Sequence, residues 1–131
     1  MNYSKRFSSK FFAKLLQPEG QNPQRDRASS LSIVFELLDE KEDKGNYLIV
    51  ETGCMRGDHK PVNSPYALGD DGASTYIFDD FINFYDGEVL SVDIKQENVD
   101  YADKYTSDRT SVFCQDSVEF LWGLSEKEKI D

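Results

Sequence analysis

Apolar residues recur with two different periods along this chain, and these periods separate helical from strand segments. Over residues 7–16 the large apolar side chains lie four or five positions apart, which places them on one face of a helix. A second helix of about 15 residues is predicted from an N-cap at Ser29 or Ser30 to Gly45. Two prolines and a glycine without any large apolar residue predict a linker at 18–28.

From residue 46 onward, short apolar runs alternate with helical segments. The expected strands are 46–51, 88–94 and 109–114, and the expected helices lie after them at 71–85, 96–105 and from 117 onward. Another strand is expected to begin at Lys129-Ile130. Strands that alternate with helices predict an α/β fold with a parallel sheet, right-handed crossovers and helices on both faces.

Residues 54–71 show neither helical nor strand periodicity and contain two prolines and two glycines. Such a length exceeds a plain connection and predicts a binding loop or a lid. His59, with Asp58, Asp70 and Asp71, offers a base or a divalent-cation ligand set as one alternative, and solvated loop residues as the default. No metal site is predicted, because paired cysteines, a second histidine and a calcium-loop spacing are all missing.

Composition narrows the classes of protein to consider. The 131 residues carry 15 Lys plus Arg and 25 Asp plus Glu, a formal net charge of −10. Nucleic acid is therefore not expected as the main partner, since binding it requires neutralised phosphates. No apolar run approaches the roughly 20 residues of a transmembrane helix, so a soluble cytoplasmic protein is expected. Cys54 and Cys114 are expected to be reduced, partly buried thiols.

Residues 1–17 differ in charge from the remainder, because they contain four basic residues and no acidic one. They are predicted to form a basic amphipathic helix. Packing as a brace over the domain is the first interpretation, and binding to an anionic membrane surface or service as a targeting segment are the alternatives. The domain organisation expected is this helix at 1–17, the linker at 18–28 and one domain at 29–131.

The residues just past each strand are the candidates for ligand binding, since ligands of parallel sheets sit beyond the carboxyl ends of the strands. Gly53 permits a tight turn, and a helix beginning near Gly72 would offer N–H groups to an anionic group. Asp93 could accept hydrogen bonds from both hydroxyls of an adenosine ribose. Asp116 and Ser117 could bind an adenine edge. Together they predict a site for a nucleoside with a charged tail.

The order of these motifs resembles the class I S-adenosylmethionine-dependent methyltransferases, most closely the small-molecule O-methyltransferase branch. The resemblance covers about residues 46 to 131. It implies a Rossmann-like three-layer sandwich and S-adenosylmethionine as cofactor. It also implies that a set of residues binds the cofactor, in the order methionine part, charged end of the methionine, ribose and adenine. These cofactor-binding residues are Glu51, Thr52, Gly53, Gly72, Ser74, Thr75, Asp93, Asp116 and Ser117.

Two departures from that family affect the prediction. About eighteen residues separate Gly53 from Gly72, where the family has a compact glycine-rich turn. Only strands 1–3 of the family's seven are present, so the chain is expected to be an N-terminal fragment with an apolar sheet edge and a tendency to self-associate. The resemblance implies that the residues that bind the methyl acceptor and act as a base lie beyond Asp131.

Three functions from different classes follow. The first is the cofactor-binding half of a methyltransferase that transfers a methyl group to O or N of a small acceptor. The second is an NAD-dependent oxidoreductase, favoured by Asp93 and opposed by the missing GxGxxG. The third is a non-catalytic nucleotide-binding or interaction module, for which the helix at 1–17 would be the contact.

Overall fold

The computed structural model describes residues 2–16, 25–54 and 74–125, and these divide into two compact units. Described residues up to Lys44 form the first unit, and those from Gly45 onward form the second. The expected strand at Lys129-Ile130 and the segment 54–71, apart from Cys54, lie outside the described residues. The helix expected at 29–45 thus groups with the N-terminal helix rather than with the strands.

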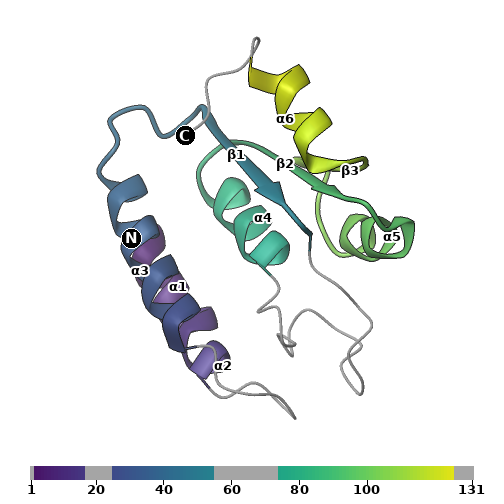
Figure 1. Ribbon diagram of the computed structural model, residues 1–131. Coiled ribbons are helices and arrows are strands. Elements are labelled where there is room, and N and C mark those ends of the chain that lie inside the picture. Colours follow the sequence, from purple (N-terminus) through teal and green to yellow (C-terminus); the bar gives the residue numbers. More distant parts are fainter. Residues whose placement is uncertain (1, 17–24, 55–73, 126–131) are drawn as a thin grey trace. The chain divides into compact units, whose positions relative to one another are not determined.

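The first unit is a helical hairpin (Figure 1). Its elements are α1 (Tyr3–Phe7), η1 (Ser8–Phe12), α2 (Ala13–Leu16) and α3 (Arg25–Asp39). The predicted helix of the N-terminus is confirmed, with one turn of π-helix at its centre. Its apolar stripe packs on α3, where the Phe35 ring lies 4.7 Å from that of Tyr3 and 5.1 Å from that of Phe7. Within the hairpin, the helix therefore acts as a brace for α3.

The π turn has a physical reason in the spacing of the buried residues. Tyr3, Phe7, Phe11 and Leu15 are at most 1% exposed and lie four positions apart. In an α-helix each step of four residues rotates a side chain by about 40° from its predecessor, because a turn holds about 3.6 residues. The wider π turn removes part of this rotation, so all four side chains stay on the face that packs against α3.

The helix α3 begins earlier than expected. Its first residue is Arg25, so the predicted linker at 18–28 is too long by four residues, and its end at Asp39 leaves the following charged run outside the helix. Ala28, inside the predicted linker, is fully buried. The Asp39 carboxylate accepts hydrogen bonds from the backbone N–H groups of Tyr3 at 3.0 Å and Ser4 at 2.9 Å. It thus supplies a negative charge to the N-terminus of α1.

The second unit contains a parallel three-stranded sheet in the order β1-β2-β3 with three helices, which confirms the α/β class and the parallel strands. Most bounds agree with the predicted ones within one or two residues. The elements are β1 (Tyr47–Thr52), α4 (Ser74–Phe84), β2 (Gly87–Asp93), α5 (Gln96–Lys104), β3 (Thr110–Cys114) and α6 (Ser117–Ser125).

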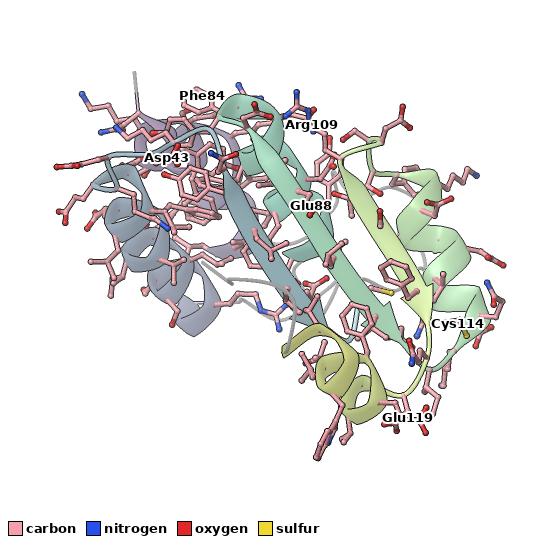
Figure 2. All side chains as sticks on the ribbon, turned by 90° about the horizontal axis from the view of Figure 1, so that it is seen from above. Asp43, Phe84, Glu88, Arg109, Cys114 and Glu119 are labelled. Carbon is pink, nitrogen blue, oxygen red and sulfur yellow. The ribbon has the colours of Figure 1, made fainter. Side chains whose placement is uncertain are left out.

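The helices cover both faces of this sheet. Helices α4 and α5 lie on one face and α6 lies on the other (Figures 1 and 2). On the α4 face, Tyr47 packs against Phe81 with ring centroids 4.8 Å apart. On the α6 face, Phe113 contacts Phe120 at 5.3 Å. Alternate residues of a strand point to opposite faces, so each strand of this sheet contributes to two apolar layers.

The core of the second unit is built on β1, β2 and α4. Phe81, Ile82, Ile77, Val89 and Val92 are fully buried. Apolar side chains also remain on the surface, and they gather on α6, where Val118 is 60% and Trp122 is 73% exposed. Among the described residues, no helix is long and apolar enough to cross a membrane.

Candidate functional site

A cleft of about 280 Å³ opens at the carboxyl ends of the three strands. In Figure 2 this end of the sheet is marked by Cys114 on β3 and Glu119 on α6. Four of the residues predicted to bind the cofactor line the cleft together with three others. The lining residues are Gly53, Val92, Asp93, Ile94, Gln115, Asp116 and Ser117.

Gly53 makes the turn that ends β1. Its φ is +81°, in the left-handed region that glycine adopts readily. Its N–H donates a hydrogen bond of 2.7 Å to the carbonyl oxygen of Val92, which extends the ladder between β1 and β2 by one residue. A Cβ atom placed on Gly53 would meet nothing within 4 Å. The glycine is therefore required for the backbone conformation, as predicted, while the space beside it stays open.

Asp93 ends β2 and is half-buried at the cleft. Its Oδ1 accepts hydrogen bonds from the backbone N–H of Lys95 at 2.9 Å and from Nδ2 of Asn98 at 3.2 Å. These bonds shape the turn that leads into α5, so the carboxylate has a structural role beside the predicted ribose binding. Because Asp93 also lines the cleft, the two roles are compatible.

Asp116 and Ser117 begin α6 at the opposite wall of the cleft. The Oδ1 atom of Asp116 accepts hydrogen bonds from the backbone N–H groups of Val118 at 2.9 Å and Glu119 at 3.2 Å. Asp116 is therefore the N-cap of α6, where a negative charge is stabilised by the helix dipole. Asp116 is exposed, and its two hydrogen bonds hold the carboxylate in place at the entrance of the cleft.

Glu51, Ser74 and Thr75 lie together, but they do not line the cleft. Glu51 is 9% exposed and accepts hydrogen bonds from the hydroxyls of Ser74 at 2.5 Å, Thr75 at 2.5 Å and Ser91 at 2.8 Å. Thr52 is exposed and is likewise not a lining residue. Gly72 lies outside the described residues.

Cys54 is buried directly after the turn at Gly53, while Cys114 is exposed, so only Cys54 matches the expected burial. Both thiols are free. Burial away from water, and after it the negative charges of Asp93 and Glu51, raise the pKa of the Cys54 thiol from 9.0 to about 12. The neutral thiol therefore dominates at physiological pH and is a poor nucleophile.

The raised pKa of Cys54 predicts a loss of stability at alkaline pH. The folded protein holds the thiol proton more tightly than the unfolded chain does. The contribution of the Cys54 thiol to the free energy of unfolding is therefore complete below pH 9.0 and falls as the pH rises toward about 12. We expect the melting temperature to fall more steeply between pH 9.0 and 10.5 in the wild type than in Cys54→Ala. Tyr101, whose pKa is also raised by burial, titrates in both proteins and cancels in the comparison. Parallel curves would contradict the assignment.

The sequence predicted no binding role for Val92 and Ile94, whereas Gln115 was among the residues expected just past the third strand. Ile94 is 71% exposed at the rim, directly after Asp93. Gln115 donates its backbone N–H to the carbonyl oxygen of Asp93 at 3.0 Å, which joins the ends of β2 and β3. An exposed apolar residue directly after a strand-ending carboxylate was the available signal, because such a position offers a flat apolar surface to a bound ring.

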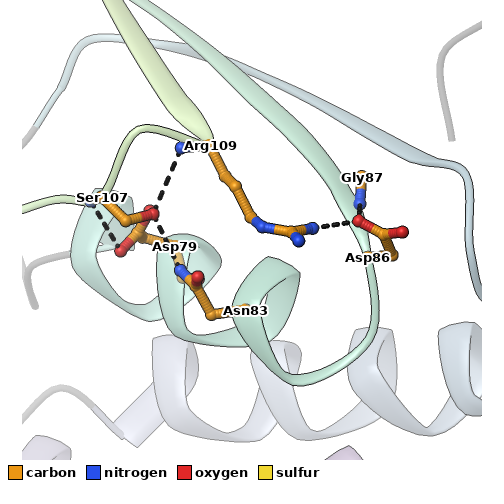
Figure 3. Close-up of polar contacts among 6 residues, drawn as sticks. All are labelled: Asp79, Asn83, Asp86, Gly87, Ser107 and Arg109. Carbon is orange, nitrogen blue, oxygen red and sulfur yellow. Dashed lines mark hydrogen bonds and ion pairs between the residues drawn. The ribbon is translucent and has the colours of Figure 1, made fainter.

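A second polar cluster lies at the amino ends of β2 and β3 (Figure 3). Asp79 of α4 is 7% exposed and accepts hydrogen bonds from Ser107 Oγ at 2.7 Å and Thr110 Oγ1 at 2.6 Å. Asp86 forms an exposed ion pair with Arg109, which lowers the pKa of Asp86. These contacts join α4 to β3 at the end of the sheet away from the cleft, and they serve its structure.

The cleft is acidic. Two of its seven lining residues are aspartates, and none is Lys or Arg. Carboxylates accept hydrogen bonds from hydroxyl groups and attract cations, while they repel phosphates. Within the described part of the chain, no group of three His, Cys, Asp or Glu residues is placed to hold a metal ion. The arrangement thus suits a ligand with hydroxyl groups and a neutral or positive charge.

The chain matches no protein-family model, and comparison with curated proteins and with solved structures finds no significant match.

Proposed function

We propose that this chain carries the S-adenosylmethionine site of a methyltransferase, with a Rossmann-like sheet of which β1, β2 and β3 form one half. The observation that carries the proposal is the cleft, where Gly53, Asp93, Asp116 and Ser117 meet at the carboxyl ends of the strands. This is the position at which parallel sheets bind nucleosides.

The position of α6 supports the larger sheet. Right-handed crossovers from β1 to β2 and from β2 to β3 place α4 and α5 on one face of the sheet. A helix on the other face is expected when the chain turns back across the sheet, and α6 lies there (Figure 1). In the proposed fold, a fourth strand follows α6 and pairs with β1, and the cleft lies beside this reversal.

The charge of the cleft favours S-adenosylmethionine over NAD. S-adenosylmethionine has a positive sulfonium and no phosphate, whereas NAD has two phosphates. Asp93 would accept hydrogen bonds from the ribose hydroxyls, the exposed Ile94 would pack on the adenine ring, and Asp116 with Ser117 would bind the adenine edge. The NAD-dependent oxidoreductase is therefore the weaker candidate.

In the proposed reaction, a nucleophilic O or N atom of a small acceptor displaces the methyl group from the sulfonium. The new bond to carbon forms as the C–S bond breaks and the electron pair of the C–S bond returns to sulfur. S-adenosylhomocysteine leaves, and the proton of the acceptor's O–H or N–H group passes to solvent. Catalysis of this kind depends on proximity and orientation. The residues described here would hold the cofactor, and the acceptor would be bound by the strands that follow α6.

Isothermal titration of the chain with S-adenosylhomocysteine and, separately, with NAD tests the proposal. We expect S-adenosylhomocysteine to bind with a Kd on the order of 10 μM and NAD to bind at least about tenfold more weakly, since each tenfold is about 1.4 kcal/mol. Circular dichroism of the same sample establishes that the chain is folded. A folded chain that binds neither compound, or prefers NAD, would overturn the assignment.

A further inference from the structure

Glu51 occupies a place in the second unit that the cofactor assignment does not explain. It lies at the carboxyl end of β1, two residues before the cleft begins at Gly53, and was predicted to border the cofactor. Its side chain instead points into the unit, is 9% exposed and does not line the cleft. A carboxylate buried so close to a ligand site requires compensation by hydrogen bonds.

That compensation comes from two other elements of the fold. Oε1 of Glu51 accepts hydrogen bonds from Thr75 Oγ1 at 2.5 Å and from Ser91 Oγ at 2.8 Å. Oε2 accepts a hydrogen bond from Ser74 Oγ at 2.5 Å. Thr75 and Ser91 are fully buried. Hydrogen bonds to an ionised acceptor are short and strong, and here they link α4, β1 and β2 through one side chain.

The residues bound to Glu51 lie on elements that also carry the cleft residues Gly53 and Asp93, or that pack beside them. Ser74 and Thr75 form the first turn of α4, whose helix dipole favours the negative charge of Glu51. Ser91 lies opposite Glu51 in the β1–β2 ladder, two residues before Asp93. Gly53 likewise lies two residues after Glu51. A change in the carboxylate would therefore be transmitted to both Gly53 and Asp93.

We propose that Glu51 is a positioning residue, whose buried carboxylate ties the first turn of α4 to β1 and β2 and thereby fixes Gly53 and Asp93 at the cleft. Glu51 does not contact the ligand. Cys54 follows Gly53 directly and is buried, so the accessibility of its thiol reports on the same geometry without any ligand.

The chain offers a matched control in Asp79. This carboxylate is also buried, at 7% exposure, and also accepts hydroxyl hydrogen bonds, from Ser107 and Thr110. It lies on α4, the helix that Glu51 contacts through Ser74 and Thr75, but its partners Ser107 and Thr110 are at the amino end of β3. Figure 3 shows Asp79 with Ser107. Glu51→Ala removes the carboxylate that accepts from three hydroxyls and Asp79→Ala removes one that accepts from two, so both are expected to lower the melting temperature.

The first readout is ligand-independent. In a Cys114→Ser background, the rate at which Cys54 reacts with a chromogenic disulfide reagent is measured at a temperature where all variants are folded. We expect Glu51→Ala to raise this rate by about tenfold or more through local opening, and Asp79→Ala to change it less than about twofold. Glu51→Gln keeps one acceptor oxygen, and hydroxyls can also accept, so its rate is expected within about threefold of the wild type.

The second readout rests on the proposed function and measures the Kd for S-adenosylhomocysteine. Glu51→Ala is expected to weaken binding by about tenfold or more, Glu51→Gln by less than about threefold and Asp79→Ala by less than about twofold. Unchanged Cys54 reactivity in Glu51→Ala, or an equal increase in Asp79→Ala, would overturn the positioning role. Failure of the wild type to bind would overturn the proposed function alone, since the thiol readout would still decide the role of Glu51.

Discussion

Replacing Gly87 by alanine is expected to cost about 3–5 kcal/mol of folding free energy, because it combines backbone strain with a steric clash. Gly87 begins β2 with φ at +130°, a conformation that side chains rarely adopt. A Cβ atom there would lie 2.1 Å from the carbonyl oxygen of Tyr47, which is backbone and cannot rotate away. The ladder between β1 and β2 begins at this pair, so the strands would have to separate locally.

Thermal denaturation followed by circular dichroism measures this effect. A loss of this size corresponds to a fall in melting temperature of about 10–20 °C for a chain of this length. Two other glycines separate the causes. Gly53→Ala has the positive φ without the clash and is expected to cost about 1–2 kcal/mol. Gly123→Ala, in α6 with open space around it, is expected to gain up to about 1 kcal/mol. A melting temperature of Gly87→Ala within a few degrees of the wild type would contradict the explanation.

Replacing Asp93 by asparagine is expected to weaken the binding of S-adenosylhomocysteine by about 10- to 100-fold while the chain stays folded. Asparagine keeps the Oδ1 acceptor that Lys95 and Asn98 use, so the turn into α5 is retained. It removes the charge and one acceptor oxygen, and hydrogen bonds to a charged group contribute about 1.5–3 kcal/mol. The loss should therefore fall on the ribose contact that we propose.

Isothermal titration of Asp93→Asn beside Asp100→Asn tests this prediction. Asp100 carries the same charge and lies on α5, where it accepts a hydrogen bond from Gln96 at 2.8 Å and does not line the cleft. Asp100→Asn is expected to bind within about twofold of the wild type, since an exposed charge at a distance is screened by salt. Equal losses in the two variants would mean that net charge, rather than a specific contact, sets the affinity.

Several features of the fold could be predicted from residues close together in the sequence. The three strands and the helices after them follow from apolar runs of different period, and their alternation predicts parallel pairing. The predicted tight turn at Gly53 and the predicted start of a helix at residue 117, which Asp116 caps, are confirmed, since each depends on the local backbone. Their meeting at one cleft also follows, because parallel strands end at the same edge of a sheet.

Other features depended on partners far away in the sequence. The N-cap signal at Ser29 and Ser30 was misleading, because the burial of Ala28 in the hairpin extends α3 back to Arg25. The charge at the N-terminus of α1 comes from Asp39, 35 and 36 positions from its two partners. Local propensity cannot supply such information, since packing between helices overrides it.

The sequence by itself determined which segments form helices and strands, that the strands are parallel, and which residues follow their carboxyl ends. Only the tertiary structure decided which of those residues face the cleft. Glu51 and Asp93 both lie at the carboxyl ends of strands, yet Asp93 lines the cleft while Glu51 binds the hydroxyls of Ser74, Thr75 and Ser91. The physical reason is that the direction of a buried carboxylate is set by the groups that donate hydrogen bonds to it. The donors to Glu51 come from β2 and α4, 23 to 40 positions further along the chain.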